Sequence, residues 1–140
     1  MKLRTKSKKG VGLDTNILVR YIVQDDPKQS PKATRLIESL TAEAPGYVTL
    51  VSIVELVWVL NGCYGSAKGE ICEVLETLLR SRELVVADAD IVWKALRLYR
   101  EGKADSADNL IERLSNAAGC IHTATFDRTA AGVCGMRLVD

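Results

Sequence analysis

Short apolar runs alternate with longer amphipathic segments along this chain, and this alternation constrains the fold more than any other feature. The runs cover residues 11–13, 47–50, 84–86, 120–125 and 136–139, and turn residues bound most of them. Between them, apolar residues recur at helical spacing over 17–23, 30–41, 52–60, 69–80, 90–100 and 105–118. The order predicts an α/β fold of three layers (α/β/α), in which helices cover both faces of a mainly parallel sheet of about five strands.

The chain has 140 residues and no internal repeat or low-complexity linker. We therefore expect one domain over residues 11–140, preceded by a basic extension over residues 1–10. That extension is either a solubilising tail without fixed structure or an arm that contacts phosphates. The net charge of +1 argues against a chain that binds nucleic acid through overall basicity.

Several function classes lack the residues they need. No apolar run approaches the roughly 18 residues that span a bilayer, and no secretory signal is evident, so we expect a cytoplasmic protein without a membrane contact. The four cysteines form no C-x-x-C pair and there is a single histidine, His122, which argues against a zinc site and a Ser-His-Asp hydrolase. The cysteines are expected to be buried, reduced thiols.

Three carboxylates stand where the predicted elements begin or end. Asp14 and Asp127 each follow an apolar strand, where ligands gather in open α/β sheets, although a helix N-cap or turn role explains each equally well. Glu55 lies among apolar neighbours, which makes an unpaired carboxylate costly. The spacing from Ser52 to Glu55 also fits a capping box.

Asp105, Asp108 and Glu112 share one face of a predicted helix because they are three and four residues apart. Asp105 is the natural N-cap, and Asp108 lies one turn into the helix, where capping explains it less well. Several carboxylates without a histidine or cysteine cluster suit a hard cation, Mg²⁺ or Mn²⁺. A metal site of this kind activates water and aligns a phosphodiester.

Four segments together resemble the motifs of PIN-domain proteins. They are GLDTNILVRY at 12–21, VELVW at 54–58, ADSADNLI at 104–111 and TFDR at 125–128, and they occur in order from about residue 11 to the C-terminus. The resemblance implies a parallel sheet between helices and metal-dependent ribonuclease activity. It also implies a role as the toxin of a VapBC-type toxin–antitoxin pair.

Carried over by position, the resemblance implies a catalytic site of Asp14, Glu55, Asp108 and Asp127. Asp14, Asp108 and Asp127 would be the metal ligands, with Asn16 and Asp105 as supporting polar groups. The implied partners are an RNA substrate, an antitoxin protein, and a second copy of the chain in a homodimer. We expect the RNA to enter single-stranded, because a narrow acidic cleft must reach one backbone.

Other readings of the same residues are open. An aspartyl-phosphate phosphatase would need an aspartate where Asn16 stands, and a phospho-receiver domain would need a lysine near the last strand. The non-enzymatic alternative is a PIN-like module that binds RNA or protein without cleaving. Metal-dependent cleavage of a mixed RNA pool would separate these readings.

Overall fold

The computed structural model describes residues 10–102 and 105–139. The prediction for the basic extension concerns residues 1–10 and lies almost entirely outside this part of the chain. The described strands are β1 (Val11–Gly12), β2 (Gly46–Val48), β3 (Leu84–Val86), β4 (Ala124–Thr125) and β5 (Arg137–Leu138). The described helices are α1 (Thr15–Val23), α2 (Gln29–Glu38), α3 (Leu50–Gly62), α4 (Lys68–Arg80), α5 (Ala89–Glu101), α6 (Ser106–Ala117) and α7 (Arg128–Val133).

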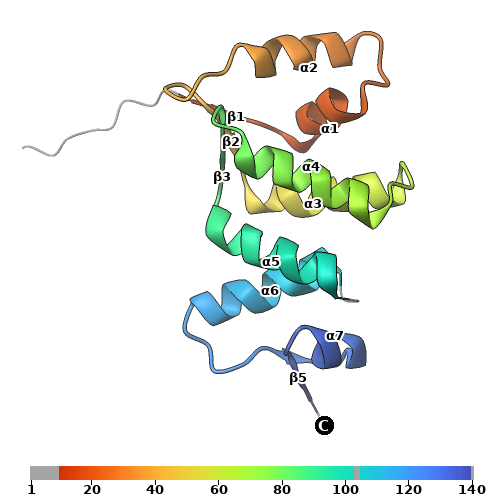
Figure 1. The fold of residues 1–140 in the computed structure, drawn as a ribbon, viewed down its shortest axis with the longest axis vertical. Helices are drawn as coiled ribbons and strands as arrows, with labels where there is room; N and C mark the ends of the chain where they lie inside the picture. The colour runs from red at the N-terminus through yellow and green to blue at the C-terminus, as the bar shows by residue number, and fades with distance from the viewer. Residues whose placement is uncertain (1–9, 103–104, 140) are drawn as a thin grey trace, which may run out of the picture.

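Strands β1, β2 and β3 form a parallel sheet in that order (Figure 1). Helices connect the strands, as parallel pairing requires. The middle strand begins at a buried glycine, Gly46, where a Cβ atom would stand 2.7 Å from Leu13 Cδ1 and 2.8 Å from Leu40 Cδ1. Any other residue would therefore displace these two core leucines at the start of the strand.

Strands β4 and β5 pair with each other in a separate parallel sheet. The predicted α/β class with parallel strands is confirmed, but the five described strands are divided between sheets of three and two. Consequently β1 is an edge strand, and both Val11 and Gly12 are exposed. The prediction of a buried strand over 11–13 is wrong for these two residues, and Leu13 alone of the three is buried.

The main core lies between the helices and the three-stranded sheet. Helix α3 contributes Ile53, Leu56, Val57 and Leu60, which follow the helical period. Helices α4 and α5 pack against each other and extend the same cluster. Each fully buried aliphatic side chain of this kind contributes roughly 1.5–3 kcal/mol to folding, so this cluster is the main source of stability.

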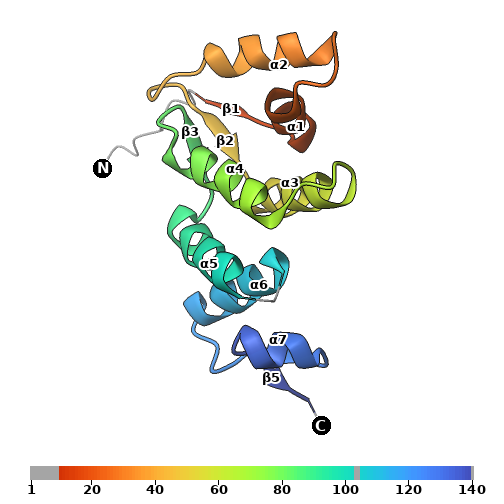
Figure 2. The same ribbon diagram turned by 45° about the vertical axis from the view of Figure 1, so that its right-hand side comes forward.

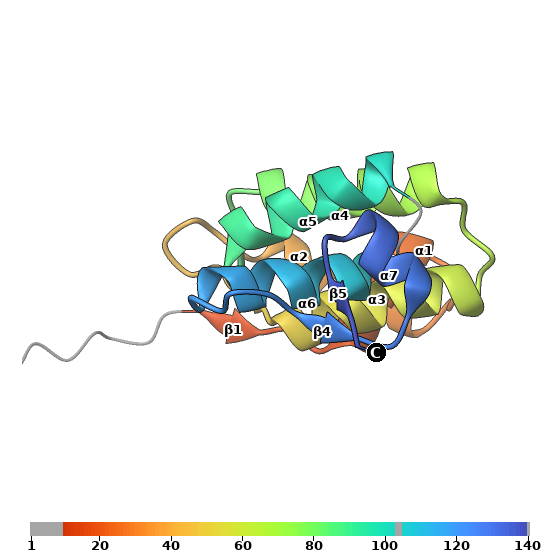
Figure 3. The same cartoon turned by 90° about the horizontal axis from the view of Figure 1, so that it is seen from below.

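The C-terminal elements stand apart from this core. Figures 1 and 2 show α1 and α2 at one end of the long axis and α7 with β5 at the other. Seen from that second end, α6, β4, α7 and β5 lie in front of the remaining elements (Figure 3). A small cluster of Ala130, Cys134 and Met136 forms the separate core of α7 and the residues that follow it, whereas α6 contributes Leu110 to the main core.

Several predicted boundaries need correction. Helix α3 begins at Leu50 because Thr49 caps it, with its side chain accepting from Ser52 N at 3.1 Å, so the segment 47–50 is a strand only as far as Val48. The predicted strand over 120–125 shortens to two residues. Helix α7 was not predicted, because its six residues include a glycine and offer little periodicity.

Two of the four cysteines contradict the prediction that all are buried. Cys72 and Cys134 are buried, whereas Cys63 and Cys120 are exposed free thiols. Within residues 10–102 and 105–139, no helix is both long and apolar enough to cross a membrane.

Candidate functional site

Asp14 stands two residues beyond the end of β1 and begins α1. Its extended backbone and its side chain make it the N-cap, with Thr15 N donating to Oδ1 at 2.7 Å. The carboxylate is exposed, and it retains acceptor positions because the cap uses one of its oxygens. The predicted alternatives of N-cap and ligand are therefore compatible at this residue. Asn16, the predicted supporting group, is also exposed in the first turn of α1.

Glu55 is joined to the start of α1 by a hydrogen bond across the fold. The hydroxyl of Thr15, which is buried, donates to Glu55 Oε1 at 2.7 Å. The capping-box reading of Glu55 is wrong, since Thr49 caps α3. Although its neighbours in the sequence are apolar, Glu55 itself is exposed, because Leu56 and Val57 are the residues that face the core.

Asp14 and Glu55 share the wall of an open cavity of about 420 Å³ between α1 and α3. Thr15 and Asn16 line it from the same turn, and Arg20 and Tyr64 close its far side. The Arg20 guanidinium is engaged there, with Nη1 at 3.0 Å from Asp25 Oδ1 and 3.2 Å from the Tyr64 hydroxyl. The cavity therefore presents two carboxylates and one amide to solvent beside a cation that is already paired.

Asp105, Asp108 and Asp127 form a second acidic group around the starts of α6 and α7. Asp105 caps α6, with Asp108 N donating to its Oδ1 at 2.8 Å, which confirms the predicted N-cap. Asp127 caps α7 and accepts from Thr129 N at 2.8 Å and Ala130 N at 3.1 Å. The structural role that was the predicted alternative for Asp127 is therefore that of a helix N-cap.

Asp108 is the partly buried carboxylate of this group, whereas Asp105 and Asp127 are exposed. Burial raises the pKa of the Asp108 carboxyl, and the charges of Asp105 and Asp127 raise it further. The nearby Cys134 thiol also has a raised pKa, first from its burial and then from the charge of Asp108. Like charges crowded in this way favour a bound proton or a bound cation over free carboxylates.

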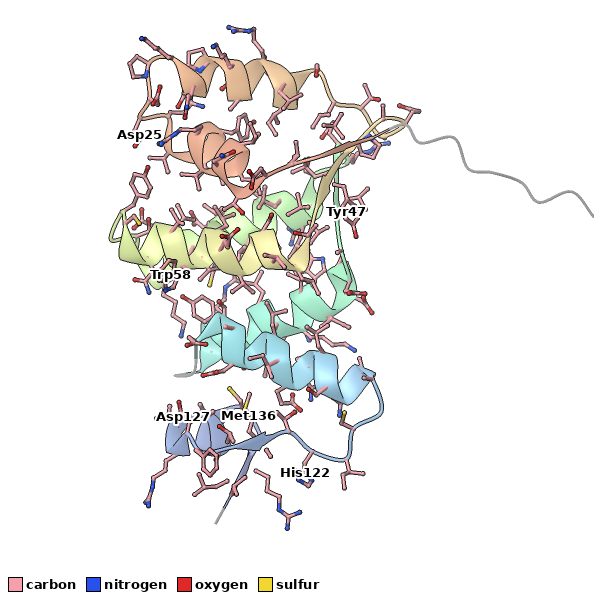
Figure 4. All side chains as sticks on the ribbon, turned by 180° about the vertical axis from the view of Figure 1, so that it is seen from behind. Asp25, Tyr47, Trp58, His122, Asp127 and Met136 are labelled. Atoms are coloured by element: carbon pink, nitrogen blue, oxygen red, sulfur yellow. The ribbon has the colours of Figure 1, made fainter. Side chains whose placement is uncertain are left out.

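The two acidic groups are not brought together within one chain. In the described part of the sequence, no group of three or more His, Cys, Asp or Glu side chains is placed to hold a metal ion. Figure 4 shows Asp127 in the C-terminal elements, with α3 and α5–α6 between it and the helix that Asp14 begins. The physical reason is that β4 pairs with β5 and does not extend the sheet beside β1.

Two residues of the site were missed by sequence reasoning. The Thr15 hydroxyl orients the Glu55 carboxylate, and the one sequence feature that could have pointed to Thr15 is its position directly after the capping residue Asp14. Asn109 is 2% exposed, donates from Nδ2 to Asp105 O at 3.0 Å, and accepts from Cys134 Sγ at 3.4 Å. It thereby joins the first turn of α6 to the end of α7, a contact that spacing along the sequence does not indicate.

Comparison with known proteins supplies the family. A search of the curated proteins found no match to this chain. The model of the PIN domain family matches residues 11–135, a span that includes all four acidic motifs. The chain therefore belongs to the PIN domain family.

Proposed function

We propose that this protein is a ribonuclease that depends on Mg²⁺ or Mn²⁺ and hydrolyses phosphodiester bonds of single-stranded RNA. PIN domains are generally nucleases, and they generally use divalent metal ions. The observation that carries the proposal is the family match over 11–135, within which all four expected acids are present. Asp14 and Asp127 are helix N-caps, and Asp108 lies in the first turn of α6.

The chemistry of the donors fits a hard divalent cation. Asp14 and Glu55 are exposed in one cavity, and Asp108 and Asp127 lie in the second group, so every ligand offered is a carboxylate oxygen. Asp14, Asp108 and Asp127 would hold the ion, with Glu55 completing the acidic pocket, and this requires the two acidic groups, which lie apart within one chain, to come together. When bound, such an ion activates water and stabilises the charge that develops on the phosphate.

The protein's own contribution is to hold these carboxylates in place. Thr15 orients Glu55, and the backbone N–H groups of Thr129 and Ala130 fix the Asp127 carboxylate. Asp105 anchors the first turn of α6 and so positions Asp108. Asn16 lines the same cavity and would hydrogen-bond a ribose or phosphate oxygen of the RNA.

A cleavage assay tests the proposal. The wild-type protein should cleave a mixed single-stranded RNA pool with MnCl₂ or MgCl₂ and should stop when EDTA is added. Asp14→Asn and Asp108→Asn should each lower the rate by orders of magnitude without changing the circular dichroism spectrum. Asp90→Asn is the matched control, because Asp90 is an exposed acid in the first turn of α5. Wild-type rates for both site variants would overturn the assignment.

The finer proposal is that the nuclease is the toxin of a VapBC-type pair, restrained by an antitoxin. It rests on the resemblance of the motifs, GLDTNILVRY above all. Expression of the wild-type chain should then arrest growth, and Asp14→Asn should not. The alternative of an RNA- or protein-binding module without catalysis predicts RNA binding that EDTA does not affect and no cleavage at any metal concentration.

A further inference from the structure

The described strands leave two open edges whose hydrogen-bonding groups match. Val11 N donates to Pro45 O and Leu13 N to Tyr47 O, both at 2.9 Å, so residues 11 and 13 face β2. Because backbone groups alternate along a strand, the N–H and C=O of Gly12 point away from β2. In the described part of the chain β1 is the terminal strand of its sheet and Gly12 is exposed, so this edge is open.

Strand β4 has the same arrangement. Thr123 O accepts from Arg137 N at 2.7 Å and Thr125 O from Val139 N at 2.8 Å, so both threonines face β5. Ala124 and Phe126 consequently direct their backbone groups to the opposite edge, where no described strand lies. Phe126 is 83% exposed, and Leu138 and Val139 at the neighbouring strand β5 are 38% and 42% exposed, so several apolar residues of this small sheet face solvent.

The two edges also agree in register. If β1 and β4 pair in parallel so that both backbone groups of Gly12 are hydrogen-bonded, Thr125 lies opposite Gly12. In this register the Gly12 N–H donates to Ala124 O, and the Phe126 N–H donates to Gly12 O. Two residues further along, this register sets Asp14 beside Asp127, on strands about 4.8 Å apart. Both aspartates are helix caps two residues beyond their strands, so the match follows from the same spacing in each half.

The edges cannot meet within one chain of this structure. Helices α5 and α6 lie between β1 and β4 along the long axis in Figures 1 and 2. Helix α6 packs against α5 and α3, and Cys134 and Asn109 join α7 to α6. Closing the gap internally would require these contacts to be released, whereas a second copy can supply the missing strand without such a change.

We propose that two copies of this chain exchange strands, so that β4 of each copy pairs with β1 of the other. The exchange is reciprocal and closes with two-fold symmetry, which leaves neither edge open. Each dimer then contains two five-stranded sheets and two composite acidic sites. Each composite site takes Asp14 and Glu55 from one copy and Asp108 and Asp127 from its partner. The composite-site part of this inference rests on the proposed nuclease function, whereas the strand pairing does not.

Cysteine cross-linking tests the pairing without reference to activity. In a Cys63→Ser, Cys120→Ser background, which removes the exposed thiols, one chain carries Val11→Cys and a second, size-tagged chain carries Ala124→Cys. The two are refolded together and treated with a short bismaleimide. A mixed dimer linked between these two positions is expected, and because each chain carries one of the two engineered cysteines, that link must join different copies.

The matched control moves the first cysteine to the other edge of the same sheet. Val85 on β3 is 47% exposed and Val11 on β1 is 46% exposed, so their accessibility to the reagent is equal. Val85→Cys paired with Ala124→Cys should link no more than random collision allows. Equal linking by both pairs, or linking by neither while circular dichroism shows folded protein, would overturn the exchange. A monomer at all concentrations in sedimentation would overturn it too.

Mixing inactive variants tests the composite site. When Asp14→Asn and Asp127→Asn chains are refolded together in equal amounts, half of the dimers contain both. Each mixed dimer has one site with both lesions and one intact site, so roughly one quarter of the wild-type activity should return. Mixtures that stay inactive although the wild type cleaves RNA would overturn the exchange and leave the nuclease proposal standing. A wild type that never cleaves overturns the nuclease proposal, and cross-linking then decides the exchange alone.

Discussion

Replacing Asp14 by asparagine and, separately, by alanine distinguishes the capping role of its side chain from its negative charge. Its carboxylate accepts from Thr15 N at 2.7 Å at the start of α1. Asparagine keeps an oxygen acceptor and caps helices about as well as aspartate, whereas alanine has no acceptor. The proposed metal site, by contrast, needs the charge, and both substitutions remove it.

The expected magnitudes follow from the local geometry. Helix α1 buries Leu18 and Val19 in the main core, so fraying at its first turn weakens the whole fold. Loss of a capping acceptor costs about 1 kcal/mol of unfolding free energy, which lowers the Tm of a domain of this size by about 4 °C. We expect this loss for Asp14→Ala and a change within about 0.5 kcal/mol for Asp14→Asn. Both variants should lose RNA cleavage.

The assay is thermal and urea unfolding in EDTA, followed by RNA cleavage in MnCl₂, for the wild type and both variants. Asp90→Asn and Asp90→Ala provide the matched pair, since Asp90 lies within the first turn of α5 and is not its cap. Equal stability of the two Asp14 variants would show that the bond to Thr15 N contributes nothing. Cleavage by Asp14→Asn at the wild-type rate would remove Asp14 from the catalytic site.

Three further outcomes are expected. Mn²⁺ at ten to a hundred times its dissociation constant should stabilise the wild type by roughly 1.4–2.7 kcal/mol in scanning fluorimetry, and an equal shift in Asp14→Asn would contradict ligation by Asp14. Because the pKa of Asp108 is raised in the folded state, its contribution to the free energy of unfolding is fully present at acid pH. That contribution is lost as pH rises through the folded-state pKa and the carboxyl ionises. Without metal, Asp108→Asn should therefore become more stable than the wild type as pH rises from acid to neutral. A difference in unfolding free energy that stays the same across this pH range, measured by urea titration of both proteins, would refute this. Thr15→Val should slow cleavage without abolishing it, because Glu55 loses its orienting hydroxyl but keeps its charge, and an unchanged kcat would show that this bond has no role.

The helices and their buried faces could be predicted because their signals are local. Leu56 and Leu60 recur at helical spacing in α3, as do Ile71 and Leu75 in α4, and the structure places all four in the main core. The N-cap at Asp105 was also predictable, since the residue type and its place before an apolar period agree. The acids themselves were found from their places at strand ends and first helical turns.

The pairing of the strands could not be predicted, because it depends on contacts between distant segments. Two-residue strands such as β1 and β4 carry too few side chains to specify a neighbour. Nothing near Gly12 in the sequence indicates that its open side lacks a partner strand in the described chain. The bond from Thr15 to Glu55 joins residues 40 positions apart, and that separation likewise leaves no local signal.

The small C-terminal core sets the order in which the molecule opens. Three buried side chains, Ala130, Cys134 and Met136, hold α7 and its two strands together, whereas the main cluster draws buried side chains from five helices. The segment from Gly119 to His122 that precedes these elements is exposed and lies outside any helix or strand. A protease should therefore cut there first, while the rest of the fold stays intact. Because that cut separates Asp127 from the other acids, proteolysis would end activity long before it removed the folded protein, and the lifetime of function would be shorter than the lifetime of the chain.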